Sequence, residues 1–387
     1  MKTVLIISYS PLHKDPRILR QVEALKSNYK ITTIGFTKIE DNAIIHYSVN
    51  MPPKKTLMEK VYWLLCLLVR KHYFILKTLE STLYLNDILS LNIIIPNIII
   101  ANDWNGLYLA SELKKKHSWL SKIYFDAHEY APKEKNASLK WRIMIQPVII
   151  YVLKKCKADI TVMSAVCEGI AREYEKYFSF SKGFVRVITN AAKYSDTLKP
   201  GKTKEVIRLI HHGAALEVRR LELMIKMMKY LDPSKYELTF MLVKNDPKYY
   251  KRLVELSKNH NNISFIEPVQ FHDITKILNA YDIGVFLLLP EHFNYKYALP
   301  NKLFEFIQAR LAIAIGPSIE MMKIVDRYNL GVYSKNFSPK SLADSIVQMI
   351  PEKIMEYKRN AEKHARTLSA EENIRKIKLI MTELEDE

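Results

Sequence analysis

Glycine and cysteine are both scarce in this sequence of 387 residues, which contains 9 glycines and 3 cysteines. No G-x-x-x-x-G-K-[ST] motif occurs, which argues against a P-loop nucleotidase, and no G-x-G-x-x-G follows either predicted first strand, which argues against a dinucleotide oxidoreductase. H-E-x-x-H, paired C-x-x-C, G-x-S-x-G and D-x-D are also absent. Any bound phosphate must therefore be held by protein cations and helix N-termini, and we expect no metal and no cofactor.

The cysteines Cys66, Cys156 and Cys167 are too few and too widely spaced for a disulfide framework. We expect them to be reduced and partly buried, as in a cytosolic protein. Long apolar runs are missing as well, because Val61–Val69 lies between charged residues and Val4–Ile7 is too short for a signal peptide. A membrane span needs about 20 apolar residues, so we expect a chain that does not cross a bilayer.

The composition is that of a folded protein, with 48% hydrophobic and 26% charged residues, and the length favours two domains. The formal net charge is +18, and it is uneven: residues 1–200 hold 30 Lys and Arg against 17 Asp and Glu. A basic first half predicts an anionic partner such as a membrane surface, nucleic acid or a phosphorylated substrate. The alternative is a solvated, lysine-rich surface.

The first half reads as a parallel, doubly wound α/β domain. Val4–Ser8 predicts a buried strand, Asp15 caps a helix that begins at Pro16, and Ile31–Phe36 predicts the next strand. Further strands are predicted at 98–101, 123–126, 160–163 and 185–189.

The pattern restarts after a linker at Lys193–Lys204, with strands at 206–211, 237–243, 263–265, 283–289 and 312–315 and a helix at 221–230. We place an N-terminal domain at 1–195, a C-terminal domain at 205–365, and a terminal helix at 366–387 that packs back across the cleft. In such folds, ligands bind at the carboxyl ends of the strands, in a cleft between the two sheets.

Three segments at predicted strand ends carry the candidate chemistry. His212–Glu222 combines a glycine turn with Arg219 and Arg220 at a helix entrance, which suits a diphosphate. Ala298–Ile307 predicts a helix start with Lys302 in its first turn and with Glu305 placed to accept hydrogen bonds from a ribose diol. Tyr124–Tyr130 ends a strand in His128 and Glu129 at the cleft edge.

Together these segments resemble the GT-B glycosyltransferases of the large retaining family four, particularly its bacterial polysaccharide-assembly members. The matching stretches are Asp15-Pro16-Arg17, Asn102–Asn105, Phe125–Glu129, Ser164–Ile170, Asn190-Ala191, Gly213–Glu222, Asp282-Ile283-Gly284 and Pro300–Glu305. The P-N-K-L-F-E run is the most specific of them. The resemblance implies two Rossmann-like domains facing a central cleft.

The resemblance also implies a UDP- or GDP-linked sugar donor held by the second domain and a glycan or lipid-linked acceptor held by the first. On the donor side it implies Gly213, Arg219 or Arg220 with Lys302 at the diphosphate, Asn301 beside Lys302, Glu305 at the ribose and the backbone of Glu267–Val269 at the base. It places His128 and Glu129 near the reacting centre, and Asp15, Arg17 and Asp103 on the acceptor side. The implied reaction is sugar transfer with retention and without a metal, in surface-polysaccharide (capsule or lipopolysaccharide) assembly.

The sequence departs from the family pattern at several positions. Ser8–Pro11 lacks glycines, and Ala214 stands where many relatives have an arginine. Tyr297 stands near the usual position of a second glutamate, and either Glu291 or backbone amides would take the role of that glutamate. The alternatives are therefore a GT-B sugar-nucleotide epimerase, using His128, Glu129 and Glu291, and a catalytically weak relative that acts as a binding protein. A nucleic-acid-binding function has no recognised module to support it.

Basic and aromatic residues mix with apolar ones in Leu57–Leu85 and Trp141–Lys157, a composition typical of helices that bind an anionic leaflet. The alternative is that these are core-facing helices of the first domain. We expect a cytoplasmic protein that is peripheral on the inner face of the plasma membrane, with no nucleic acid as partner.

Overall fold

The computed structural model of the chain describes residues 1–50, 56–68 and 85–386. It divides into two compact units. Unit 1 comprises Met1–Thr189, His292–Asn294 and Ile374–Glu387, and unit 2 comprises Asn190–Glu291 and Tyr295–Asn373. The C-terminal residues of the chain therefore belong to unit 1.

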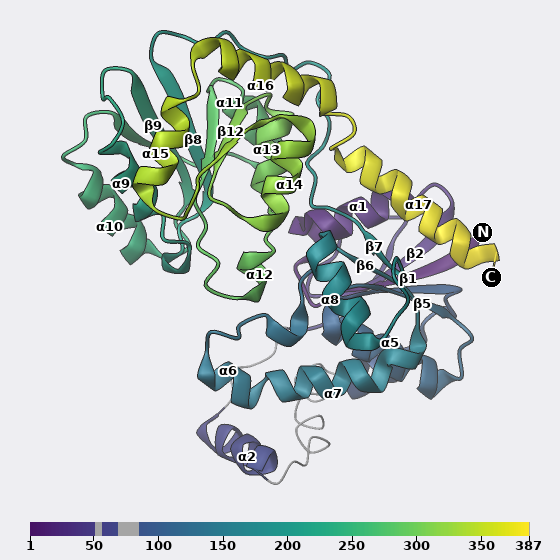
Figure 1. The fold of residues 1–387 in the computed structure, drawn as a ribbon. Helices are drawn as coiled ribbons and strands as arrows, with labels where there is room; N and C mark the ends of the chain where they lie inside the picture. The colour runs from purple at the N-terminus through teal and green to yellow at the C-terminus, as the bar shows by residue number, and fades with distance from the viewer. Residues whose placement is uncertain (51–55, 69–84, 387) are drawn as a thin grey trace. The chain divides into compact units, whose positions relative to one another are not determined.

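Within the described residues, unit 1 is built on a sheet of seven parallel strands in the order β3-β2-β1-β4-β5-β6-β7 (Figure 1). The strands are β1 (Lys2–Ile7), β2 (Tyr29–Gly35), β3 (Ile45–Ser48), β4 (Ile98–Asn102), β5 (Lys122–Asp126), β6 (Ile160–Ala165) and β7 (Val185–Val187). The helices are α1 (Pro16–Leu25), α2 (Leu57–Leu68), α4 (Leu85–Leu89), α5 (Asp103–His117), α6 (Leu139–Met144), α7 (Gln146–Cys156), α8 (Glu168–Phe178) and α17 (Ala370–Asp386).

The middle strands of this sheet are continuous apolar runs, as expected for a parallel sheet covered on both faces. The residues Val4, Ile6, Ile98 and Ile100 are almost fully buried. They share a core with α1 and with the C-terminal helix α17, whose Met381 is fully buried. The predicted cap of α1 is confirmed, since the Asp15 carboxylate accepts a hydrogen bond from the Arg17 amide at 3.0 Å.

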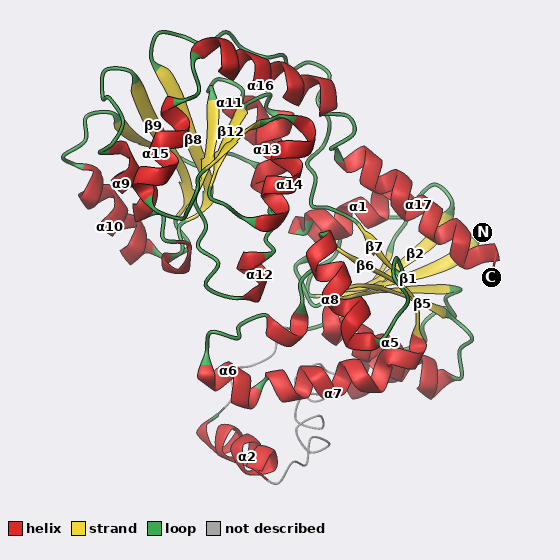
Figure 2. Cartoon of the chain, viewed as in Figure 1, coloured by secondary structure: helices red, strands yellow, loops and turns green. Residues whose placement is uncertain are grey.

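Unit 2 repeats the architecture with six parallel strands among the described residues, in the order β10-β9-β8-β11-β12-β13 (Figure 2). The strands are β8 (Ile207–Ala214), β9 (Tyr236–Val243), β10 (Ile263–Ile266), β11 (Ile283–Phe286), β12 (Ala312–Ile315) and β13 (Gly331–Tyr333). The helices are α9 (Glu222–Met228), α10 (Pro247–Ser257), α11 (Ile274–Leu278), α13 (Asn301–Gln308), α14 (Ile319–Tyr328), α15 (Pro339–Val347) and α16 (Pro351–His364), and the short α12 (Phe293–Lys296) runs from unit 1 into unit 2.

One predicted turn in unit 2 is wrong. The segment His212–Ala214 continues strand β8, because its backbone pairs with β9 up to the partners Ala214 and Val243. Gly213 suggested a turn, but it pairs with Leu242 of β9 as part of the strand and has a φ of +126°. Two strands, β3 and β13, were not predicted.

The three cysteines carry no disulfide and are buried. Among the described helices, none combines the length and the apolar character that a membrane span requires. The predicted membrane helix Leu57–Leu85 is described only over α2 and at Leu85, because residues 69–84 lie outside the described part of the chain.

Candidate functional site

The carboxyl ends of the parallel strands in unit 2 bring the predicted donor residues to one edge of the sheet. Gly213 lies near the end of β8, and Lys302 lies in the first turn of α13. A Cβ added at Gly213 would lie 3.4 Å from Lys302 Nζ and 3.5 Å from Arg219 Nη1. The bare backbone of Gly213 therefore lets two cationic side chains approach the same strand end.

Lys302 is buried without an anionic partner at contact distance. Its Nζ lies 3.4 Å from His211 Nε2 and 4.0 Å from the centroid of the Phe286 ring. Among the described residues, no carboxylate oxygen lies within salt-bridge distance of Lys302. Burial and the neighbouring Arg219 hold the pKa of Lys302 well below its usual range, although Glu305 acts in the opposite direction. An anion bound beside Lys302 and Arg219 would favour the charged form of this lysine.

Glu305 lies one helical turn further along α13 and faces His212. The Glu305 Oε2 and His212 Nε2 atoms are 3.2 Å apart, yet Nε2 makes no hydrogen bond within the described structure. Burial, with the charges of Lys302 and Arg219, lowers the pKa of His212 to about 3. The imidazole is therefore neutral near pH 7, and the contact is not an ion pair. Burial raises the pKa of Glu305 to about 7, an effect that Lys302 reduces.

The structure distinguishes the two adjacent arginines. Arg219 closes a short 3-10 turn (Glu217–Arg219), and its Nη1 donates to the Ala214 carbonyl at 3.4 Å, beside the strand end. Arg220 adopts a left-handed conformation with φ of +51° and directs its Nε to Glu291 Oε1 at 3.2 Å. Arg219 is thus the arginine that lies with Lys302, and Arg220 is exposed and ion-paired.

The contacts of Lys302 do not include the remaining donor candidates, which lie at the same edge of the sheet. Asn301 is the first residue of α13 and is half-buried. Glu267 and Val269 follow β10, where Glu267 is exposed and its Oε1 accepts from Lys244 Nζ at 2.7 Å. The order of the strands therefore places all of these residues at one edge of the sheet. Close approach or electrostatic interaction links only four of them: Gly213, Arg219, Lys302 and Glu305.

In unit 1 the predicted acceptor residues form one charged cluster. Arg17 Nη2 and Nη1 donate to the two carboxylate oxygens of Asp103 at 3.1 and 3.5 Å, and Asp15 lies 3.8 Å from Arg17 Nη2. Burial alone would lower the pKa of Arg17, but the carboxylates of Asp103, Asp126 and Asp15 outweigh it and raise the pKa. Asp103 begins α5 in a left-handed conformation with φ of +59°. Its pKa is lowered because Arg17 and His128 outweigh the effect of burial.

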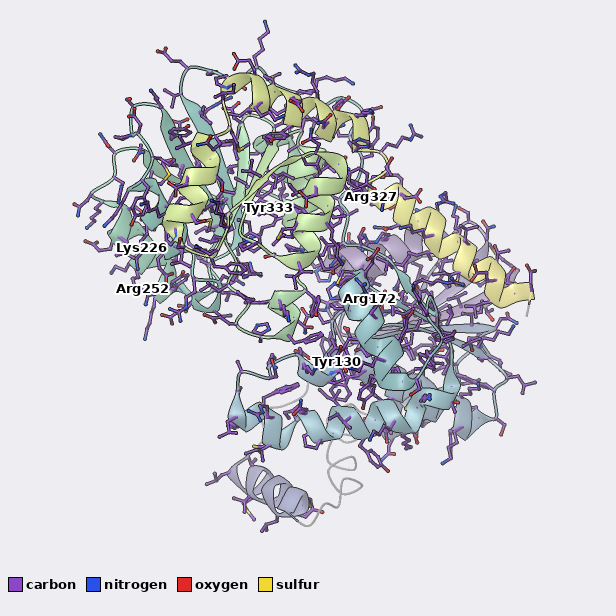
Figure 3. All side chains as sticks on the ribbon, viewed as in Figure 1. Tyr130, Arg172, Lys226, Arg252, Arg327 and Tyr333 are labelled. Carbon is purple, nitrogen blue, oxygen red and sulfur yellow. The ribbon has the colours of Figure 1, made fainter. Side chains whose placement is uncertain are left out.

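His128 and Glu129 follow β5 and line a cavity of about 590 Å³ together with Asp103. Asn294 Nδ2 donates to Glu129 Oε2 at 3.0 Å, and its Oδ1 accepts from the amide of Tyr130, the buried residue labelled in Figure 3, at 3.1 Å. Burial and the carboxylates of Glu134 and Asp103 raise the pKa of Glu129 to about 7.

A network of buried polar side chains connects the strand ends next to this cavity. This network was not predicted from the sequence. Gln21 Nε2 donates to both Asn102 and Asp126 at 2.8 Å, and Ser164 Oγ donates to Asp126 at 2.7 Å. The Tyr124 hydroxyl lies 2.8 Å from Ser164 Oγ. The network joins α1 to the ends of β4, β5 and β6, and so fixes the strand ends that carry Asp103 and His128.

Two other features of the site were not predicted. Asn294 is separated from Glu129 by 165 positions, and no local pattern links them. The cavity also includes Glu134 and Trp141, of which only Trp141 was noted, as part of a membrane-facing helix. Among residues 1–50, 56–68 and 85–386, no group of three or more His, Cys, Asp and Glu side chains is arranged to hold a metal ion.

The whole chain is similar to several solved structures. HepE of Anabaena in complex with UDP matches with a TM-score of 0.69 and 12% identity, over 99% of this chain and 100% of that chain. Sucrose-phosphate synthase of Thermosynechococcus elongatus matches at 0.67 and 14%, over 100% and 98%. An α,α-trehalose-phosphate synthase (UDP-forming) of Burkholderia vietnamiensis matches at 0.69 and 9%, over 100% of both chains.

The chain has the GT-B fold. The two doubly wound units, with seven and six parallel strands among their described residues, agree with the predicted fold class. No family model and no curated protein matches the sequence. At these identities the likeness of a GT-B fold establishes the architecture, and the chemistry must be argued from the residues themselves.

Proposed function

We propose that this protein is a retaining glycosyltransferase that takes its sugar from a UDP- or GDP-linked donor bound to unit 2. The observation that carries the proposal is Lys302, a buried lysine without a carboxylate partner, beside Gly213 and Arg219 at the carboxyl edge of the sheet. A buried cation of this kind is unfavourable by itself and becomes favourable when an anion binds. The presence of UDP in the HepE structure supports a nucleotide diphosphate as that anion.

In the proposed reaction, Lys302 and Arg219 stabilise the negative charge that develops on the departing diphosphate. The bond between the anomeric carbon and the phosphate oxygen breaks, the acceptor oxygen bonds to that carbon on the same face, and its proton passes to a diphosphate oxygen. Fixed cations that act on developing charge are a sufficient source of rate enhancement. Glu305 accepts hydrogen bonds from the ribose, Asn301 and the backbone of Glu267–Val269 complete the nucleotide contacts, and no metal is required.

The proposal assigns the acceptor, a glycan or a lipid-linked glycan, to unit 1. Arg17, Asp15 and Asp103 form a rigid charged group there, and His128 and Glu129 line the adjoining cavity. His128 and Glu129 are proposed to contact the reacting groups. The biological role that we propose is surface-polysaccharide assembly in a bacterium.

The donor site is tested by isothermal titration of UDP, GDP and their sugar conjugates into the wild-type protein and into Lys302→Ala and Glu305→Ala. We expect at least a tenfold loss of affinity in both variants, because a hydrogen bond to a charged group is worth about 1.5–3 kcal/mol. Lys226→Ala, on the exposed face of α9, is the matched control and should bind as the wild type does. Wild-type affinity in both site variants would refute the assignment, and loss of activity in EDTA would refute metal independence.

Glu129 gives one specific reason to keep a sugar-nucleotide epimerase as the second candidate. A carboxylic acid with a pKa of about 7 is suited to both donating and accepting protons at neutral pH. An epimerase would convert the nucleotide sugar in the absence of any acceptor, whereas a transferase would need one. Incubating the protein with the nucleotide sugar alone, and analysing the sugar product, separates the two.

We further propose that unit 1 binds the inner face of the plasma membrane through a basic surface at the ends of α5 and α7, which lie side by side in Figure 1. Lysines 114, 115 and 116 end α5, lysines 154 and 155 end α7, and Lys157 follows. Leu120, in the loop after α5, is 96% exposed among them. Several cations around an exposed leucine suit an anionic lipid surface.

Sedimentation with vesicles of phosphatidylcholine and phosphatidylglycerol tests this surface. The triple variant Lys115→Gln, Lys116→Gln and Lys154→Gln should lose most of the salt-sensitive binding, since each cation near such a surface contributes about 1 kcal/mol. Changing three exposed lysines of unit 2 to glutamine (226, 229 and 335) is the control for net charge. Equal binding by both triple variants would contradict the proposed surface.

A further inference from the structure

The residues that line the cavity beside His128 all belong to unit 1. Its apolar lining includes Trp141 of α6, Ile145 between α6 and α7, and Ile149 of α7. The residues that follow β4 and β5 supply its polar lining and a second indole, Trp104. At about 590 Å³ the cavity has the size of a small-molecule site. Indole surfaces together with polar side chains suit the apolar C–H faces and the hydroxyl groups of a sugar ring.

Three acidic residues and one lysine line this cavity. The acidic residues are Asp103, Glu129 and Glu134, and the lysine is Lys135. Lys135 Nζ lies 3.5 Å from Glu134 Oε1, and its side chain is largely exposed. Arg17 lies behind Asp103 and is already bound to it through two hydrogen bonds. A ligand in the cavity therefore meets carboxylate oxygens, which accept hydrogen bonds from hydroxyl and ammonium groups and repel anions.

The same carboxylates also act on the pKa of Glu129. After burial, the causes that raise it are the carboxylates of Glu134 and Asp103, which disfavour a further negative charge at the same place. The same repulsion acts on any anionic ligand group, and the opposite holds for an ammonium group.

We infer that this cavity holds the accepting end of the glycan as an uncharged sugar or an amino sugar, and that it rejects sugars that carry a phosphate or a carboxylate. The inference rests on the proposed function, in that unit 1 holds the acceptor, and it adds the chemical class of that acceptor. Carboxylate oxygens of Asp103, Glu129 and Glu134 accept from the hydroxyl or ammonium groups of the ring, while Trp104 and Trp141 supply the apolar surface.

The test uses the full chain without any donor, and matched sets of probes that differ only in charge. Each set consists of a hexose, its 2-amino form and its 6-phosphate, in the gluco, galacto and manno series. Saturation-transfer NMR at pH 7 ranks their affinities. We expect the amino sugar of at least one series to bind at least tenfold more tightly than the 6-phosphate of that series, with the neutral hexose between them or equal to the amino sugar.

A charge-neutralising variant connects the preference to the cavity. Glu134→Gln removes one negative charge from the cavity and should reduce the ratio of amino-sugar to sugar-phosphate affinity at least threefold. Glu112→Gln is the control, because Glu112 pairs with Lys155 at 2.7 Å and does not line this cavity. Thermal unfolding of both variants checks that they are folded.

Three results would overturn the inference: binding of none of the probes, a sugar phosphate that binds as tightly as its amino sugar, or an unchanged ratio in Glu134→Gln. These results are distinct from failure of the proposed function, which is read from UDP and GDP binding at unit 2. Normal nucleotide binding without sugar discrimination contradicts only the acceptor class. Sugar discrimination without nucleotide binding contradicts the proposed donor site.

Discussion

Lys302 is held among His211, Phe286 and Arg219, and no carboxylate oxygen of the described residues lies within salt-bridge distance of its ammonium group. In the ligand-free protein this arrangement costs stability, since burial removes the ammonium group from water. Replacing Lys302 with an apolar residue of similar length removes that cost. The same substitution removes the ammonium group that we expect to contact the diphosphate.

We therefore expect Lys302→Met to change stability and binding in opposite directions. Without ligand, the free energy of unfolding should rise by about 1–2 kcal/mol, as happens when buried charges are replaced by apolar residues. UDP should no longer raise the melting temperature, because stabilisation by a ligand follows its binding to the native state. Calorimetry with and without UDP measures both effects, and a variant that is both less stable and able to bind UDP would contradict this account.

The pKa of Glu305, raised to about 7 by burial, predicts how stability depends on pH. The native carboxyl holds its proton up to about pH 7, whereas an unfolded glutamate releases it near pH 4.3. The native state therefore binds more protons between these values, and stability falls as the pH rises through this window. Its contribution is on the order of 3 kcal/mol.

Urea unfolding of the wild type and of Glu305→Gln between pH 4.5 and 8 tests this. The difference in unfolding free energy between them should shift in favour of the variant across the window and level off above about pH 7. Lys302 and His212 act on or lie beside this carboxyl group, and Arg219 acts on Lys302. All three are present in both proteins, so their own titration cancels to first order. A difference that does not vary with pH would contradict the raised pKa.

At the scale of elements, helix α13 is placed by its contact with strand β11. The ring of Phe306 lies against Gly284, where an added Cβ would overlap it. Phe306 is one residue from Glu305 and one turn from Lys302, so the glycine sets the distance of both functional side chains from the sheet. The backbone at Gly284 does not require a glycine, because its φ is outside the left-handed region. The space taken by the Phe306 ring is the reason for this glycine.

Gly284→Ala should therefore weaken both stability and donor binding. We expect a loss of about 1–3 kcal/mol from overpacking, together with at least a tenfold weaker affinity for UDP as α13 moves away. Gly201→Ala is the control, because a Cβ there would make only ordinary contacts at 3.7 and 3.8 Å. Urea unfolding and titration calorimetry check the two effects, and an unchanged UDP affinity would show that α13 is not positioned in this way.

Elements with a strong apolar signal were predicted from the sequence, and weaker ones were not. Strands such as β1 and β4 are runs of buried branched residues, and such runs are informative by themselves. Strand β3, Ile45–Ser48, is partly exposed and holds His46, and β13 has only three residues. Such strands depend on a neighbour for their pairing, and a sequence window does not show the neighbour.

The candidate site was likewise predicted only in part from the sequence. Parallel topology placed Gly213, Lys302 and Glu305 at one edge, because the carboxyl ends of parallel strands meet there. The choice between Arg219 and Arg220 required the backbone angle at Arg220, which turns its side chain toward Glu291. The hydrogen bonds of Asn294 to Glu129 and Tyr130 join distant parts of the chain, for which the sequence holds no periodic signal.

At the scale of the whole molecule, the chain does not divide into two consecutive pieces. Residues 374–387 belong to unit 1, and α17 contributes Ile377, Ile380, Met381 and Leu384 to its core. From the sequence we predicted a charged terminal helix that packs back across the cleft. The sequence did not show that the apolar residues of this helix lie in the core of unit 1. Because its apolar residues share one core with residues of β1 and α1, the stability of unit 1 depends on this helix.

Ending the chain before Ile374 should therefore destabilise unit 1 and leave unit 2 folded. The four buried side chains are at most 3% exposed, and burying each is worth about 1.5–3 kcal/mol, so most of the stability of a typical domain would be lost. Hydrogen exchange followed by mass spectrometry should show loss of protection in β1 and β4 and full protection in β8 and β9. Met381→Ala is the milder variant, with an expected loss of about 2–5 kcal/mol in unit 1, and Leu379→Ala, at a side chain that is 50% exposed, is its control. Equal loss of protection in both units would show that the helix supports the molecule as a whole and not the core of unit 1.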